Sequence, residues 1–344
     1  RIYQRDGNRV ETSYKYDNTT RRLIRLTDLS LQTGIVLQDN SYLYDQVGNI
    51  TRIDDYGLNP RSQTYTYDKA NRLVFSDGVW QNNAPHYVAY YTYSPAGRMV
   101  HKEVTSMRTS THIGAYHVDY SNSFDYNIAN NPFAVSAIQD HVSGSTTDFS
   151  WDANGNLIQA KSNSPYMERR LCWSEDNRMQ AYWECSKESG GSAAYYNYTA
   201  DGNRNFKLTS PRIHITQNAQ EVMQNPLMAY PTLYASPLIT LTQHGYTKHY
   251  FEGDRRICSK IGGGFGNIRS DSLEIVVREL GASYEEQFEQ QNFGVKETFH
   301  RCIGVDPDLK TKCDLYDILL KIESNRNDIE PVYFYHSDHL GSAA

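Results

Sequence analysis

Two hydrophobic patterns divide the chain. Over residues 1–267, apolar and polar residues alternate in short runs, and pairs of aromatic residues separated by one position recur. Strand side chains point alternately to two faces, so each pair places both rings on one face of a strand. Over 268–325, apolar residues recur every three or four positions, as on an amphipathic helix. The pattern predicts a β-strand array followed by a mainly helical insertion.

Seven units within the first region carry the same short motif. The residue after the pair is Asp, Ser or Thr, and Gly or Asn follows three positions later in six units. A short oxygen-bearing side chain suits the first position of a type I turn, and Gly or Asn tolerates the positive φ of the bulge position after it. Each unit is therefore predicted to form a β-hairpin. The motif residues are Tyr14, Tyr16 and Asp17; Tyr42, Tyr44, Asp45 and Gly48; Tyr65, Tyr67, Asp68 and Asn71; Tyr91, Tyr93, Ser94 and Gly97; Phe149, Trp151, Asp152 and Gly155; Leu171, Trp173, Ser174 and Asn177; and Tyr196, Tyr198, Thr199 and Gly202.

The spacing of the units is regular with a few exceptions. Consecutive units are 22 to 28 residues apart, apart from one jump of 58 between Tyr91 and Phe149. Thr20 breaks the motif of the first unit and suggests a loop longer by one residue. In the last unit the next apolar residue is Phe206, which leaves that register open. One such hairpin cannot bury its aromatic face alone, so the hairpins are expected to pair into a continuous, mostly antiparallel sheet.

These repeats resemble the YD-repeat or RHS (rearrangement hotspot) family, whose signature is Tyr-Asp followed by a Gly-Asn or Asn-Arg turn and an apolar residue. Residues 250–257 resemble the segment that usually precedes the RHS-associated core. Residues 333–342 resemble the start of that core, through Tyr333, Tyr335, His336, Asp338, His339 and Gly341. The resemblance covers about 1–260 and 332–344.

The resemblance implies an all-β fold in which antiparallel hairpins form a curved sheet or partial hollow shell. It divides the chain into a repeat array at 1–267, a mainly helical insertion at 268–331 and the start of a core strand at 332–344. In toxins of this family the shell encloses a C-terminal effector, and many members cleave themselves at an aspartate-dependent site beyond this segment. No catalytic residue is therefore carried over. The chain is expected to be a piece of a longer exported or cell-surface protein.

Composition narrows the function classes. The 344 residues include 28 Tyr against 11 Phe and 4 Trp, and the formal charge is −6. The acidic balance argues against nucleic-acid binding, and no apolar run is long enough to span a bilayer. The five Cys are widely spaced and lack the close spacing of metal-ligand motifs. Isolated thiols are therefore expected, with room for one incidental disulfide pair.

The insertion is predicted to hold one helix beginning near Ser270–Ser272 and a second from about Asp308 to Ser324. Packing on the rim of the sheet and a partner-binding or plugging role both remain open for it. His336 and His339 would point to opposite faces of a strand, which disfavours a metal site. No motif of a hydrolase, a metalloprotease, a calcium loop or a phosphate-binding loop occurs, so neither an enzyme nor a cofactor is predicted.

Two functions remain. The first is a non-enzymatic scaffold that encapsulates or presents a downstream effector domain of the same polypeptide. The second is a cell-surface carbohydrate-binding or adhesion module, in which exposed Trp80 and Trp183 would stack on sugars, whereas Trp151 and Trp173 occupy repeat positions. Glycans or a component of a secretion system are further candidate partners.

Overall fold

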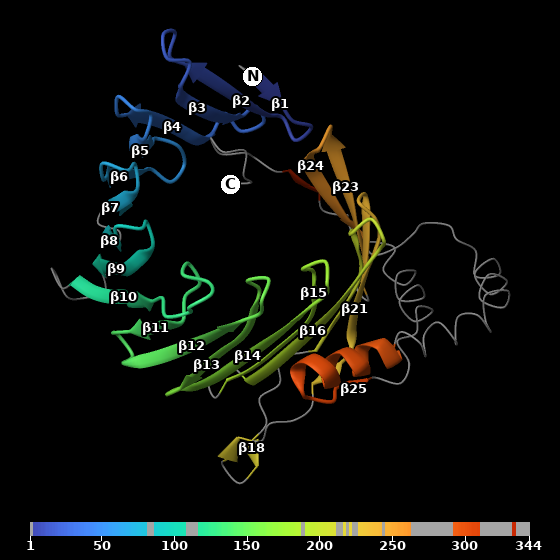
Figure 1. Ribbon diagram of the computed structural model, residues 1–344. Coiled ribbons are helices and arrows are strands. Elements are labelled where there is room, and N and C mark those ends of the chain that lie inside the picture. The colour runs from blue at the N-terminus through green and yellow to red at the C-terminus, as the bar shows by residue number, and fades with distance from the viewer. Residues whose placement is uncertain are drawn as a thin grey trace, which may run out of the picture. The chain divides into compact units, whose positions relative to one another are not determined.

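The computed structural model describes residues 3–80, 86–107, 116–186, 190–210, 216–217, 220–221, 226–242, 245–262, 292–309 and 332–334. Two compact units divide the chain, with the boundary between Thr146 and Thr147. Both units are built from strands, as Figure 1 shows, so the predicted all-β class is confirmed.

The first unit is an antiparallel meander in which each strand pairs with the next along the chain. Alternation along these strands buries one face and leaves the other open. Leu26 and Tyr42, for example, are almost fully buried, whereas Leu43 is exposed. The strands are β1 (Tyr3–Arg5), β2 (Val10–Tyr16), β3 (Leu23–Ser30), β4 (Val36–Tyr44), β5 (Ile50–Asp55), β6 (Arg61–Tyr67), β7 (Leu73–Trp80), β8 (His86–Tyr93), β9 (Met99–Met107), β10 (Tyr116–Asp125) and β11 (Ala137–Asp140).

The second unit continues the same plan. Successive strands from β12 to β17 pair antiparallel, β17 then pairs with β21, and β21 to β24 form a further meander whose last strand pairs with β26. The strands of this sheet are β12 (Ser145–Trp151), β13 (Leu157–Asn163), β14 (Tyr166–Trp173), β15 (Met179–Ser186), β16 (Gly190–Tyr198), β17 (Arg204–Thr209), β21 (Tyr230–Ser236), β22 (Ile239–Thr242), β23 (Gly245–Glu252), β24 (Arg255–Gly262) and β26 (Val332–Phe334). Short strands β18 (Thr216–Gln217) and β19 (Gln220–Glu221) pair with each other, and β20 (Leu227–Met228) pairs parallel with β25 (Asp308–Leu309).

One helix packs on the sheet of the second unit. Residues 292–298 are α-helical, and the last turn, η1 (Phe299–Ile303), widens to a π-helix that ends at left-handed Gly304. Val295, Phe299 and Ile303 lie on one side of this helix and are at most 1% exposed. They pack with Cys172 and Trp183 of β14 and β15, together with further apolar residues of β15 to β17 and β20. This contact forms the hydrophobic core of the unit.

The predicted insertion is only partly within the described residues. The first predicted helix and most of the second lie outside them. The start of the second, Asp308–Leu309, is a short strand instead, because its backbone pairs with Leu227–Met228. The division at 267 and 331 stays a prediction. Among the described residues, no helix combines the length and the hydropathy needed to cross a membrane.

Candidate functional site

The repeat positions form an extensive side-chain network in the described part of the chain, beginning with the turns. All six Gly and Asn residues at the predicted left-handed position have positive φ, from 58° at Asn71 and Asn177 to 107° at Gly48. In the unit of Asp45, the amide of Asp45 donates to the carbonyl of Asn49, and the amide of Gly48 donates to the carbonyl of Asp45. The same pair of bonds recurs in the other five units, so the hairpin prediction is confirmed.

The two irregular units follow the same logic. In the first, Asp17 N donates to Arg22 O at 2.8 Å, so the loop is longer by one residue as predicted, and Arg21 takes the left-handed conformation. In the last unit, Thr199 N donates to Asn203 O and Tyr198 pairs with Arg204. The register left open by the sequence is therefore regular, with Arg204 at the position that is apolar in other units.

The first turn residue caps its own turn through its side chain. Asp45 Oδ1 accepts from the amides of Gly48 (2.7 Å) and Asn49 (2.8 Å). Asp68 Oδ1 accepts from the amide of Arg72, while its Oδ2 accepts from Arg72 Nε at 2.7 Å. The bond from the Arg72 side chain, followed by those from backbone amides, holds the pKa of Asp68 below its usual range. Asp17, Asp45 and Asp152 make equivalent bonds, and hydroxyl oxygens replace the carboxylate in the other units.

In four of the seven motif units the second aromatic residue ties its hairpin to the preceding one. Its hydroxyl or indole N–H donates to the carbonyl of the residue that begins the return strand of the previous hairpin. The bonds are Tyr44 to Leu23 (2.7 Å), Tyr67 to Ile50 (2.8 Å), Trp173 to Leu157 (2.7 Å) and Tyr198 to Met179 (2.8 Å). The polar atom of the ring thus supplies a bond between units, while the ring covers the strand beneath it.

Two further units escaped the sequence motif. Tyr126 donates to Met99 O at 2.7 Å, which is the bond that second aromatic residues make in the other units. Phe124 precedes Tyr126 by two positions, so an aromatic pair was present within the 58-residue jump, but Asn127 and not Asp follows it. At the start of the chain, Asp6 N donates to Val10 O, and Arg9 is left-handed. There Arg5 replaces the second aromatic residue.

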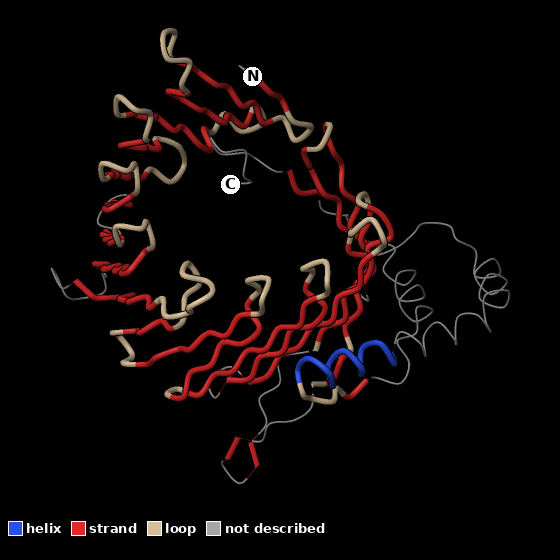
Figure 2. The backbone as a smooth tube through the Cα atoms, in the orientation of Figure 1, coloured by secondary structure: helices blue, strands red, loops and turns tan. Residues whose placement is uncertain are grey.

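The turns of neighbouring repeats also contact one another. In the second compact unit these turns lie in a row (Figure 2). The contact comes from the residue just before the return strand. Where it is Asn, the next turn has Asn at its left-handed position: Asn49 Nδ2 donates to Asn71 Oδ1 (3.0 Å), and Asn156 Nδ2 to Asn177 Oδ1 (2.8 Å).

Where the residue before the return strand is Arg and a motif turn follows, as at Arg22, Arg72 and Arg178, that next turn has Gly. Arg22 donates to the carbonyl of Asp45, and a Cβ on Gly48 would lie 2.9 Å from Arg22 Nη2. Arg72 likewise stacks on Tyr93, with Cζ 4.8 Å from the ring centroid, and donates to Ser94 O. Asn before the return strand therefore pairs with a left-handed Asn in the next turn, and Arg pairs with a left-handed Gly.

The candidate sugar platform does not form at Trp183. Its side chain is 3% exposed in the core beneath the helix, with the Arg170 guanidinium 5.5 Å from its ring. Trp173 is tied to Leu157 as a repeat residue. The side chain of Trp80 lies outside the described part of the chain.

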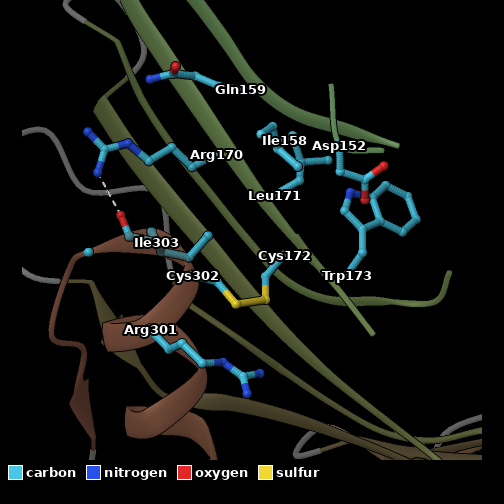
Figure 3. A pocket seen from close by; sticks show the side chains of 11 residues that line it. Asp152, Ile158, Gln159, Arg170, Leu171, Cys172, Trp173, Arg301, Cys302 and Ile303 are labelled. Carbon is cyan, nitrogen blue, oxygen red and sulfur yellow. Dashed lines mark hydrogen bonds between the residues drawn. A yellow bond between two sulfur atoms is a disulfide. The ribbon is translucent and has the colours of Figure 1, made fainter. Parts of the chain in front are cut away.

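A cavity of about 570 Å³ lies where the helix end meets β14, and a disulfide between Cys172 and Cys302 borders it (Figure 3). These two cysteines form the one pair for which the sequence left room, because folding brings together positions 130 residues apart. Arg170 Nη1 donates to Ile303 O at 2.6 Å beside the cavity. Asp152, which also lines it, is engaged by its own turn.

The polar groups around the cavity bind one another. Glu168 is buried and accepts from Arg170 (2.7 Å), Tyr166 (2.8 Å) and Gln159 (2.8 Å). Burial raises the pKa of Glu168, but these three bonds outweigh it and hold the pKa below its usual value. An ionised, fully bonded carboxylate is suited to holding the sheet together and poorly suited to proton transfer.

The described residues contain no group of three or more His, Cys, Asp or Glu side chains able to hold a metal ion. Of the core-like motif, Tyr333 lies in β26, whereas Tyr335, His336, Asp338, His339 and Gly341 lie outside the described residues. Their roles remain predictions.

Comparisons with known proteins agree with this architecture. No protein-family model matches the chain. Over 98 residues it is 33% identical to "Toxin subunit YenC1" of Yersinia entomophaga, which covers 25% of this chain and 10% of that protein. The Tc holotoxin pore of Photorhabdus luminescens with a TccC3 mutation matches with a TM-score of 0.51 at 20% identity, covering 76% of this chain and 13% of that chain. The structure of TcdB2-TccC3 without its hypervariable C-terminal region matches with a TM-score of 0.46 at 18% identity, over 76% of this chain and 13% of that chain.

This chain thus spans about a tenth of the length of the proteins that it matches. The likeness to the holotoxin pore concerns the fold alone, and the local sequence match concerns a quarter of the chain. Together with the repeated hairpin and the bonds that join consecutive repeats, they support the resemblance of this chain to RHS or YD-repeat proteins.

Proposed function

We propose that this chain is a non-enzymatic structural scaffold, a stretch of an RHS-type wall that encloses or presents a toxin effector encoded downstream in the same polypeptide. The observation that carries the proposal is the repeated connection between consecutive hairpins. Strand pairing joins them throughout each compact unit, and at several junctions the bond from the second aromatic residue and the contact between turns join them as well. A wall needs such unbroken lateral contacts, whereas a catalytic site needs polar groups that are available to a substrate.

The comparisons support the association with toxins. A relative with local sequence similarity is named a toxin subunit, and one of the matching solved structures is of a holotoxin pore. Because this chain spans so little of either protein, its partner and its extracellular location are part of the proposal. A secretion-system component as a further partner remains a prediction.

The alternative is a surface carbohydrate-binding or adhesion module. Such modules need exposed rings with nearby hydrogen-bonding groups. Trp183 is buried, and the indole N–H of Trp173 is used between units. These two observations favour the scaffold.

Limited proteolysis of the parent polypeptide tests the proposal. We expect trypsin to leave the downstream segment intact while the wall is intact, and to digest the same segment rapidly when it is produced alone. A second sample, with Tyr67→Phe and Tyr198→Phe together, should lose part of the protection because two bonds between units are missing. Equal digestion of the segment in the parent and alone would refute enclosure. Binding of this chain to immobilised glycans would support the adhesion module instead.

A further inference from the structure

Three polar side chains that the repeat does not use lie in a row across the first unit. His101 is on β9, Ser123 is directly opposite it on β10, and His141 follows the last residue of β11. The amide of His141 donates to Ser121 O at 2.8 Å, which holds the backbone of His141 beside β10. Residues opposite one another in a sheet share a face, so this register gathers the side chains.

The two imidazole rings converge on one oxygen atom. Ser123 Oγ lies 3.2 Å from His101 Nδ1 and 2.8 Å from His141 Nε2, and the ring centroids are 5.9 Å apart. A hydroxyl group has a single hydrogen, so it can donate to only one of the two ring nitrogens. The other nitrogen then approaches the oxygen as an N–H donor.

The Glu103 carboxylate lies beside the Nε2 atom of the His101 ring. Glu103 Oε2 is 3.8 Å from His101 Nε2 and accepts a hydrogen bond from Ser121 Oγ at 3.2 Å. A carboxylate at this position favours the proton on Nε2 and leaves the lone pair of Nδ1 directed at Ser123. Histidines that bind metals usually donate their other ring N–H to a carboxylate or carbonyl, and a small movement of Glu103 from its 3.8 Å separation would complete that bond.

We propose that His101 Nδ1 and His141 Nε2, with Ser123 Oγ between them, bind a divalent first-row transition-metal ion such as Cu²⁺, Ni²⁺ or Zn²⁺. Imidazole ligands suit these ions, whereas Mg²⁺ and Ca²⁺ prefer oxygen ligands. When the ion binds, the proton of His141 resides on Nδ1 and its Nε2 lone pair faces the metal. Water completes the coordination, since no third His, Cys, Asp or Glu joins the described group.

The side chains have room to reach the ion. Metal–nitrogen bonds of about 2.0–2.1 Å require the two ring nitrogens to approach within roughly 4 Å of each other. His141 lies at the surface, so its ring is the one that rotates toward the ion, while the His101 side chain is 32% exposed and keeps its nitrogen open to that side. The bound ion would link β9 to the end of β11 across β10 and stabilise this part of the first unit.

Titrations of the untagged chain with Cu²⁺, followed by electron paramagnetic resonance, and with Zn²⁺, followed by calorimetry, test the proposal. We expect one equivalent to bind, with hyperfine coupling to two nitrogens, and a rise in melting temperature. His141→Gln and His101→Gln should each weaken binding at least about tenfold and leave a single coupled nitrogen. Glu103→Gln should weaken binding by about tenfold, the lower end of the effect of such supporting partners.

His117→Gln is the matched control, because His117 is on β10 and contacts Asp119 at 3.1 Å. This variant should bind like the parent chain. The absence of binding at hundred-micromolar metal would overturn the proposal, as would unchanged affinity in His141→Gln. Melting temperatures measured without metal show whether each variant is folded, and His141 is chosen first because its side chain is exposed.

Discussion

Replacement of Gly202 by Ala tests the matching between consecutive turns. Gly202 has φ of +86°, and a Cβ there would lie 2.5 Å from Cζ of Arg178, the residue before the return strand of the preceding unit. The Arg178 guanidinium sits 6.0 Å from the ring centroid of Tyr198. The substitution therefore has two costs. The alanine must adopt a left-handed backbone conformation, and its methyl group must displace the Arg178 side chain.

The two costs can be separated with Gly253, which is also left-handed at +60° but where a Cβ meets nothing within 4 Å. Gly253→Ala should cost only the backbone penalty, about 1 kcal/mol or slightly more. Gly202→Ala should cost a further ~0.5–1 kcal/mol, the value of an exposed cation–π contact. Both glycines belong to the second unit, so the same unfolding transition reports both.

Urea unfolding followed by tryptophan fluorescence measures the difference, since Trp151, Trp173 and Trp183 all lie in this unit. The excess cost of Gly202→Ala should disappear when Arg178 is also replaced by Ala. Equal costs for the two glycine variants would refute the matching of Gly to Arg. An excess that persists without Arg178 would refute it equally.

Three other predictions address single features of the network. Tyr67→Phe removes the bond to Ile50 O and should lower the free energy of unfolding by ~1 kcal/mol in urea titrations; an unchanged midpoint would contradict a role between units. The lowered pKa of Asp68 means that its contribution to stability is present above pH 3.8, its ordinary value, and is lost as the pH falls further. Unfolding midpoints should therefore drop as the pH falls from about 4 toward 2, less steeply in Asp68→Asn, and parallel pH profiles would count against this reasoning. Non-reducing peptide mapping should recover the Cys172 peptide joined to the Cys302 peptide. Reduction should lower the melting temperature, because a long-range disulfide contributes ~2–4 kcal/mol to the free energy of unfolding. Two separately alkylated peptides would show that the bond is absent.

The sequence alone determined the local structure of the repeat. A hairpin depends on backbone preferences within six or seven residues, so Asp45 at the first turn position and Gly48 at the left-handed position suffice to predict it. The longer loop at Thr20 was predictable for the same reason. The strand class follows from the alternation of aromatic residues, which a helix could not place on one face.

Only the tertiary structure decided what these hairpins do to one another. The carbonyl that receives the Tyr67 hydroxyl belongs to Ile50 in another hairpin, and no local preference indicates that bond. The unit at Tyr126 became recognisable because its hydroxyl repeats this bond although its turn does not match the motif. The disulfide between Cys172 and Cys302 and the burial of Trp183 depend on where the helix packs, which is a long-range contact set by apolar surface and not by spacing.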